Sequence, residues 1–167
     1  IINFVSIIDV ICCKSHLVNK YNYSKPIINN NYDSSFFDIK GLRHPLIEFL
    51  LENELYVPND ISLDNDSLGI LLYGTNAVGK SSFIKAIGIT IIMAQSGFFV
   101  PCNKLVFKPY SHLFTRILGN DNLFKGLSTF AVEMLELKTI LEKSNNNSLI
   151  LGDELCSGTE TDSAISI

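Results

Sequence analysis

The stretch LLYGTNAVGKSSFIKAIG, from Leu71 to Gly88, decides the fold class of this chain. In it, a short apolar run leads into a polar loop between two glycines, and Lys-Ser-Ser then opens a second apolar run. Residues 74–81, GTNAVGKS, fit the phosphate-loop pattern G-x-x-x-x-G-K-[ST]. The match is informative because the loop stands between a predicted buried strand, Leu68–Tyr73, and a predicted helix from Lys80 to about Ala94. The sequence therefore predicts nucleotide binding.

Each residue type in this loop has a physical task. Gly74 and Gly79 allow backbone N–H groups to turn inward and approach phosphate oxygens closely. The dipole of the following helix adds positive potential at its first turn, where anions bind. Lys80 is expected to reach the β- and γ-phosphates, and the Ser81 hydroxyl is expected to bind Mg²⁺.

A second motif, LILGDE at Leu149–Glu154, is an apolar run that ends in two carboxylates. Alone it is a weak signal, because solvated carboxylates are common at strand ends. In a chain that also has the phosphate loop, it predicts that Asp153 lies beside Mg²⁺ and that Glu154 is the general base for the attacking water. The pair of motifs favours hydrolysis over binding alone.

Short apolar strands alternate with helices, which indicates an α/β fold with a mostly parallel sheet covered by helices. A further helix is predicted from about Ser128 to Lys143. Residues 1–20 are interpreted as the end of a longer helix, so that residues 1–30 would end a helical core or lever region and residues 31–167 would form a truncated nucleotide-binding domain. The first residue is Ile1, not Met, and a helix pattern is starting at Ile167, so we expect a fragment.

Composition excludes several classes of protein. The net charge is −4 and the 13 Lys and Arg residues are scattered, so no basic surface for nucleic acid is predicted. The four cysteines lack metal-site spacing, which favours a reducing, intracellular compartment. The most apolar stretch, Phe83–Val100, contains Lys85 and Gln95, which favours a buried helix over a membrane span.

From about Gly41 to Ile167 the chain resembles the ATPase domain of MutS-type DNA mismatch-repair proteins, an ABC-class P-loop fold. Five motifs match this family in order, and the LSGGQ signature of ABC transporters is missing. The segments VPC and NAVGKSS are also similar to the corresponding segments of MutS-like proteins of large DNA viruses. The matching segments are RHPLIE, YGTNAVGKSS, AQSGFFVPC, LFTRILGNDNLFKGLSTFAVEM and LILGDELCSGTET.

This resemblance implies a Mg²⁺-dependent ATPase and assigns its site. Ser81 and Asp153 would bind Mg²⁺, and Glu154 would act in catalysis together with Lys80 and Ser128. Ser128 matches a serine that reaches the γ-phosphate of the partner subunit, although a helix N-cap is an alternative role for it. The residues assigned to the nucleotide are Tyr56, Gly74, Thr75, Asn76, Ala77, Val78, Gly79, Lys80, Ser81 and Ser82.

Some positions are less specific or depart from the family. Tyr56 matches the aromatic residue that stacks on adenine, although a core tyrosine would fit as well. Thr75 and Val78 replace Pro and Gly of the family loop, which is tolerable if their φ angles are negative. Elsewhere, Glu133 and Glu136 are expected to face solvent, and His44 is expected to be structural.

The resulting hypothesis is that the chain is the ATP-binding and ATP-hydrolysing domain of a MutS-like protein. This domain would couple the nucleotide state to DNA clamping. Mismatched or other double-stranded DNA would be bound by domains outside this chain, and the protein would be a homodimer or a MutS-like heterodimer without membrane contact. Two alternatives stay open: a MutS paralogue acting in recombination, and an ATP-gated DNA clamp or scaffold with negligible hydrolysis. A viral or organellar origin is left open.

Overall fold

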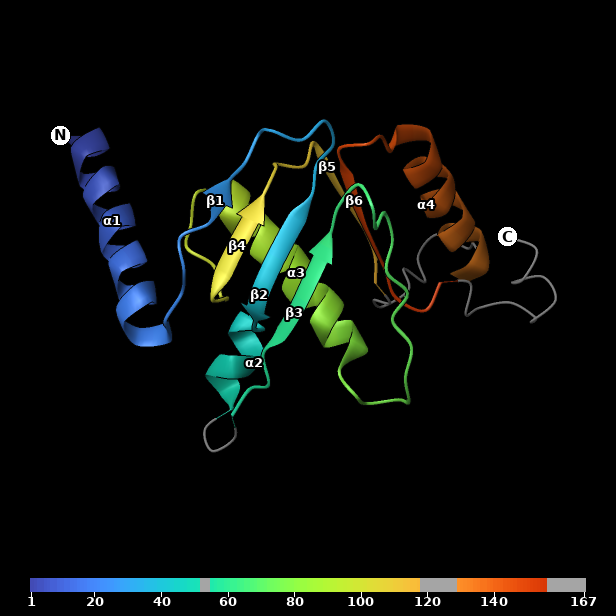
Figure 1. The fold of residues 1–167 in the computed structure, drawn as a ribbon, viewed down its shortest axis with the longest axis horizontal. Helices are drawn as coiled ribbons and strands as arrows, with labels where there is room; N and C mark the ends of the chain where they lie inside the picture. Colours follow the sequence, from blue (N-terminus) through green and yellow to red (C-terminus); the bar gives the residue numbers. More distant parts are fainter. Residues whose placement is uncertain (52–54, 118–128, 156–167) are drawn as a thin grey trace. The chain divides into compact units, whose positions relative to one another are not determined.

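The computed structural model describes residues 1–51, 55–117 and 129–155. The chain forms two compact units, Ile1–Pro109 and Tyr110–Ile167, and each has its own sheet. The helices and strands, labelled in Figure 1, are α1 (Ile2–Tyr21), β1 (Ile27–Ile28), β2 (Phe37–Leu42), α2 (Pro45–Leu50), β3 (Asn59–Leu63), α3 (Lys80–Gln95), β4 (Lys104–Phe107), β5 (His112–Arg116), α4 (Thr129–Lys143) and β6 (Ser148–Gly152).

The first unit contains a mixed four-stranded sheet in the order β1-β4-β2-β3. β1 runs parallel to β4, whereas β2 is antiparallel to both of its neighbours. Alternation along β2 buries Phe37 and Ile39, and Leu105 and Phe107 of β4 are buried as well. The predicted helix after the phosphate loop is confirmed as α3, which runs behind this sheet in Figure 1. Its buried residues are Ile84, Ala86, Ile87, Gly88, Thr90, Ile91 and Ala94.

The second unit pairs β5 with β6 in parallel, from His112 opposite Ser148 to Arg116 opposite Gly152. The apolar run before the two carboxylates is therefore a strand, as predicted. The predicted helix before it is confirmed as α4 over Thr129–Lys143. Parallel strands with a helix between them in the sequence are the arrangement that the alternating pattern indicated, whereas the sheet of the first unit is mixed and not mostly parallel as predicted.

The predicted strand Leu68–Tyr73 is wrong for this structure. Residues 67–74 have no helix or strand, and Leu71 and Tyr73 are 87% and 91% exposed. A buried parallel strand needs at least one hydrogen-bonded neighbour and cover on both faces of the sheet. No strand of the first unit's described residues pairs with this run, because its sheet ends at β1 and β3. An apolar sequence alone does not supply that neighbour.

Helix α1 confirms the helix predicted at residues 1–20, and none of its residues is buried. It ends at Asn22, whose φ of 53° is left-handed. Among the described residues it is the one helix long and apolar enough to cross a membrane, with a mean hydropathy of 1.3. This is weak support for a membrane span, because core helices and signal sequences share these properties, and Asp9 and Lys14 interrupt the helix.

Arg43 joins the end of α1 to the rest of the first unit. Its Nη2 donates to the carbonyl oxygens of Tyr21 and Asn22, at 3.0 and 3.1 Å. Its Nη1 pairs with the carboxylate of Glu48 in α2, and its backbone N–H donates to the Pro101 carbonyl at 2.9 Å. We call this set of contacts the Arg43 junction.

Gly41 lies at an irregular position of β2, where the register with β3 shifts. Its φ is +64°, and a Cβ there would lie 2.3 Å from Asn103 Nδ2. We expect Gly41→Ala to lower the free energy of unfolding by about 1–2 kcal/mol through left-handed strain, with a smaller addition for displacing the exposed Asn103 side chain. The measurement is the melting temperature of the full-length protein.

Two other glycines separate these causes. Gly97→Ala should show only the smaller strain effect, because its φ is +78° and a Cβ would meet nothing within 4 Å. Gly69→Ala has neither feature and should melt close to the wild type. Equal melting temperatures for Gly41→Ala and Gly97→Ala would show that the contact with Asn103 is unimportant.

Candidate functional site

The phosphate loop leads directly into α3, whose N-cap is Gly79. Gly79 has a φ of 95°, a conformation that residues with a Cβ rarely adopt. Thr75 and Val78 keep negative φ angles, so the loop tolerates these two departures from the family pattern. Ala77 is left-handed at 64°, which costs about 1 kcal/mol for a residue with a side chain.

Lys80 is the first residue of α3 and is held over its own loop. Its Nζ donates to the carbonyl oxygens of Gly74 and Thr75, both at 2.8 Å. An ammonium group has three N–H donors, so one donor has no partner among the described residues. The first turn of α3 contains no acidic residue, so the positive end of the helix dipole is not neutralised there. The loop can therefore receive an anion.

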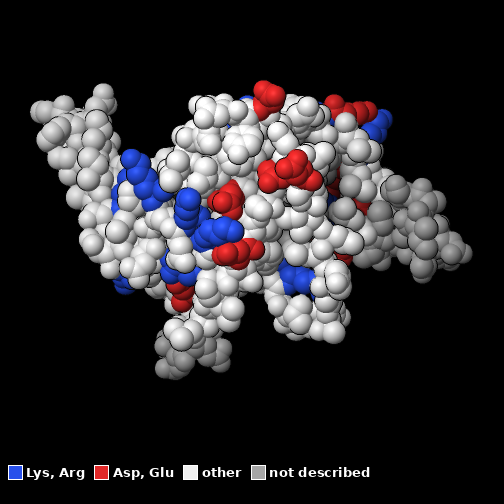
Figure 2. Space-filling model, in the orientation of Figure 1, with Lys and Arg blue, Asp and Glu red and all other residues white. Residues whose placement is uncertain are grey.

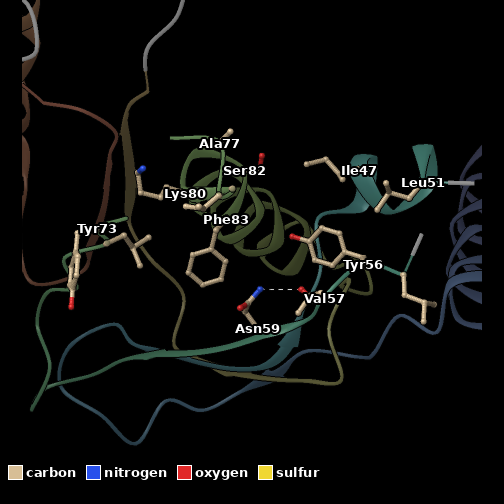
Figure 3. Close-up of a pocket in the computed structure, with 14 residues that line it drawn as sticks. Ile47, Leu51, Tyr56, Val57, Asn59, Tyr73, Ala77, Lys80, Ser82 and Phe83 are labelled. Atoms are coloured by element: carbon tan, nitrogen blue, oxygen red, sulfur yellow. Dashed lines mark hydrogen bonds between the residues drawn. The ribbon is translucent and has the colours of Figure 1, made fainter. Parts of the chain in front are cut away.

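A cavity of about 610 Å³ lies beside this loop (Figure 3). That size is within the usual range for small-molecule sites. Figure 3 shows Tyr56 on the side of the cavity opposite Tyr73 and Lys80, and burial raises the pKa of the half-buried Tyr56. The lining residues are Ile47, Leu51, Leu55, Tyr56, Val57, Asn59, Leu72, Tyr73, Ala77, Val78, Gly79, Lys80, Ser82 and Phe83.

His44 shapes one wall of the cavity indirectly. It is the N-cap of α2, and its Nδ1 accepts a hydrogen bond from the Ile47 backbone N–H at 3.3 Å. Pro45 follows at the first helical position, where its fixed φ suits the helix. Burial lowers the pKa of His44, and the charge of Lys85 lowers it further. This contact gives His44 the structural role that was predicted from the sequence.

The second motif places two carboxylates at the end of β6. Asp153 is buried, with 8% of its surface exposed, and its backbone N–H donates to the Arg116 carbonyl at 2.8 Å. Glu154 is exposed and left-handed, with a φ of 49°. The first of these two acidic residues is thus buried, with its backbone held by β5, and the second is exposed. The predicted catalytic residue Ser128 lies outside the described residues.

The charged side chains form no broad basic surface on the face drawn in Figure 2, where Lys and Arg alternate with Asp and Glu. Lys40, for example, lies 3.6 Å from the carboxylates of both Asp38 and Asp60. The site described above is suited to a small anion, and phosphate-backbone binding would need many more cations.

Comparison with known proteins identifies the family of the chain that carries these features. Residues 70–167 match the family model described as MutS domain V. The chain belongs to the MutS family. Domain V is the ATPase domain of MutS proteins, so both sequence motifs lie in the part of a MutS protein that hydrolyses ATP.

Several MutS proteins align with nearly the whole chain. The mitochondrial DNA mismatch repair protein mutS homolog of Sarcophyton glaucum is 41% identical over 170 residues, covering 100% of the chain and 17% of the relative. The mutS homolog L359 of Acanthamoeba polyphaga mimivirus is 40% identical, covering 96% and 17%. MutS of Thermotoga maritima is 41% identical, covering 96% and 19%. The chain thus spans less than a fifth of each of these relatives.

One prediction for this MutS domain is wrong. Glu133 does not face solvent; it is 3% exposed, and its Oε1 lies 4.0 Å from Arg116 Nε. Glu136 is half-exposed and lies closer, 3.3 Å from the same nitrogen. The sequence held a signal for this, since Glu133 is the only charged residue in the run FAVEML. Charges inside such runs are buried only when they are paired.

His44 makes one pH dependence testable. Its Nδ1 must be unprotonated to accept the Ile47 N–H, and its pKa is lowered in the folded protein. The unfolded chain then binds the proton more readily, so this contribution is full above about pH 6.5 and is lost as pH falls toward the lowered pKa. Melting temperatures of the full-length protein between pH 8 and 5 measure it.

His44→Asn is the matched variant, because Asn is a good N-cap that does not titrate. We expect this variant to lose less stability than the wild type as the pH falls below 6.5. If the melting temperatures of the two proteins fall in parallel as the pH is lowered, the pH dependence does not come from His44.

Proposed function

We propose that the protein binds and hydrolyses ATP with Mg²⁺ in two composite sites, and that nucleotide state controls DNA clamping by a mismatch-repair protein. The observation that supports this best is the position of Lys80. Its ammonium is fixed over the loop at the N-terminus of α3, beside a cavity of about 610 Å³, with one donor left for a phosphate oxygen.

In this proposal the loop from Gly74 to Ser82 surrounds the phosphates, with backbone N–H groups and the dipole of α3 directed at them. Tyr56 stacks on the adenine from the other side of the cavity. Its ring is half-buried there, which limits the side-chain entropy lost when a base is bound. The aliphatic lining residues Ile47 and Leu51 complete the apolar wall.

Ser81 and Asp153 are the residues that would bind Mg²⁺. Both offer hard oxygen ligands, and Asp153 is buried directly after β6, where its backbone is hydrogen-bonded to Arg116. The described residues contain no cluster of three or more His, Cys, Asp or Glu side chains that would hold a metal. Two protein ligands suit Mg²⁺, which in such sites is held mainly by phosphates and water and neutralises their charge.

Glu154 would accept the proton of the attacking water. Its carboxylate is exposed, so a water can reach it, and it directly follows the fixed Asp153. This order assigns different tasks to two adjacent carboxylates: one would position the metal, and the other would move a proton.

Partners follow from the family and from the length of the chain. Ser128 would contact the γ-phosphate of the nucleotide in a partner subunit, which requires a homodimer or a MutS-like heterodimer. Mismatched or other double-stranded DNA would be bound by the parts of the protein that correspond to the remaining length of the relatives. Such a protein would act inside a cell or organelle.

Lys80→Met tests the phosphate loop. The variant keeps the aliphatic chain but removes the ammonium, so we expect the affinity for ATP, the hydrolysis rate or both to fall by about tenfold or more. Titration with fluorescent ATP and steady-state hydrolysis by the full-length dimer measure these effects. Lys85→Met, an exposed lysine on the same helix, is the control and should behave as the wild type. Unchanged affinity and turnover in Lys80→Met would refute the proposal.

Glu154→Gln separates hydrolysis from binding. It keeps the shape and removes the base, so single-turnover hydrolysis should slow roughly 10²–10⁴-fold while Mg²⁺ and ATP still bind. Glu142→Gln, at an exposed position of α4, is the control. If wild type and Glu154→Gln hydrolyse ATP equally slowly, the protein is an ATP-gated scaffold and the general-base role is wrong.

A further inference from the structure

Arg116 connects two elements of the second unit. It is the last residue of β5 and pairs in register with Gly152, the last residue of β6. Its carbonyl oxygen accepts the hydrogen bond from the Asp153 backbone N–H at 2.8 Å. The backbone of Arg116 therefore holds the backbone of Asp153 in place where the chain leaves β6.

The side chain of Arg116 points to helix α4. Its Nε lies 3.3 Å from Glu136 Oε2 and 4.0 Å from Glu133 Oε1. These two glutamates are three residues apart and share one face of the helix. The Arg116 and Glu133 side chains are 13% and 5% exposed, so this pair is largely removed from water.

Stability alone does not account for such a pair. Desolvating two charges costs several kcal/mol, and apolar residues of similar volume often give an equally stable protein. What a guanidinium can add is direction, because its donors lie in one plane, and here its Nε lies between the two carboxylates. The result is a firm connection between α4 and the start of the Asp153 segment.

We propose that Arg116 is a positioning residue for ATP hydrolysis: together with Glu133 it holds the end of β6 against α4, so that Asp153 is kept in place to bind Mg²⁺. This inference rests on the proposed function, in which Asp153 is a magnesium ligand. Arg116 itself would touch neither the nucleotide nor the metal. Residues that orient a metal ligand typically affect metal affinity or activity by about 10–100-fold when they are replaced.

The test compares three variants of the full-length protein. Arg116→Met alone removes a cation from beside the buried Glu133, which destabilises the fold whatever else Arg116 does. The double variant Arg116→Met with Glu133→Gln removes the two buried charges at nearly constant volume and leaves the half-exposed Glu136 to be solvated by water, so we expect its melting temperature to return close to that of the wild type. Arg116→Lys keeps the charge but loses the planar donors.

The deciding readout is the Mg²⁺ concentration for half-maximal single-turnover hydrolysis, measured beside ATP binding without metal. We expect the double variant to melt like the wild type, to bind ATP without metal normally, and to need about 10–100-fold more Mg²⁺ or to hydrolyse ATP correspondingly more slowly. Arg116→Lys should fall in between. The pair Lys138→Met with Glu142→Gln removes an exposed ion pair of the same helix and should change nothing.

A folded double variant with the wild-type Mg²⁺ requirement and rate would overturn the proposal. If the double variant does not melt cooperatively, Arg116→Lys decides: a raised Mg²⁺ requirement at an unchanged melting temperature supports positioning, and a wild-type requirement overturns it. If the wild type binds ATP with Mg²⁺ but does not hydrolyse it, the proposed hydrolysis fails, whereas the Mg²⁺ dependence of ATP binding still tests Arg116.

Discussion

The Arg43 junction is the constraint that connects α1 and α2 to the rest of the first unit. One guanidinium binds two carbonyl oxygens at the end of α1 and the carboxylate of Glu48 in α2, while the Arg43 backbone is bonded to Pro101. The guanidinium also lies 5.8 Å from the ring of Tyr23, and burial raises the pKa of that tyrosine to about 12. Because α2 and its C-cap residue supply Ile47 and Leu51 to the cavity wall, this wall and the end of α1 share one anchor.

Motifs that depend on neighbours in the sequence were predicted well. The phosphate loop and α3 follow from glycines and apolar spacing within a few residues, and β6 follows from a short apolar run before two carboxylates. The sheet of the first unit was not predictable in this way. Phe37 of β2 pairs with Phe107 of β4, and nothing near Phe37 in the sequence specifies that partner. The same reason explains the error at Leu68–Tyr73, where the apolar pattern is present and the neighbouring strand is not.

The site shows a similar division. Roles that depend on residue type, such as phosphate binding by the Lys80 ammonium or metal binding by the Asp153 carboxylate, are predictions that the sequence alone can make. Roles that depend on burial could not: Glu133 becomes a buried partner only because β5 brings Arg116 to α4. His44 is intermediate, since its position before Pro45 indicated a structural role and the geometry adds the hydrogen bond to Ile47. Charged residues in apolar runs are the ones that a sequence pattern describes least well.

Helix α1 has 20 residues, so it is about 30 Å long, and its C-terminal end is held at Asn22 by the Arg43 junction. A rod fixed at one end magnifies small rotations. Turning α1 by about 10° around Asn22 would move its first residue by roughly 5 Å, given the rise of a helix per residue. The residue that holds the Asn22 end is Arg43, which also binds Glu48 of α2 and so contacts the helix that lines the cavity. Any rotation of α1 about this end would therefore displace its first residues several times more than the residues near Asn22, with no change inside the helix itself.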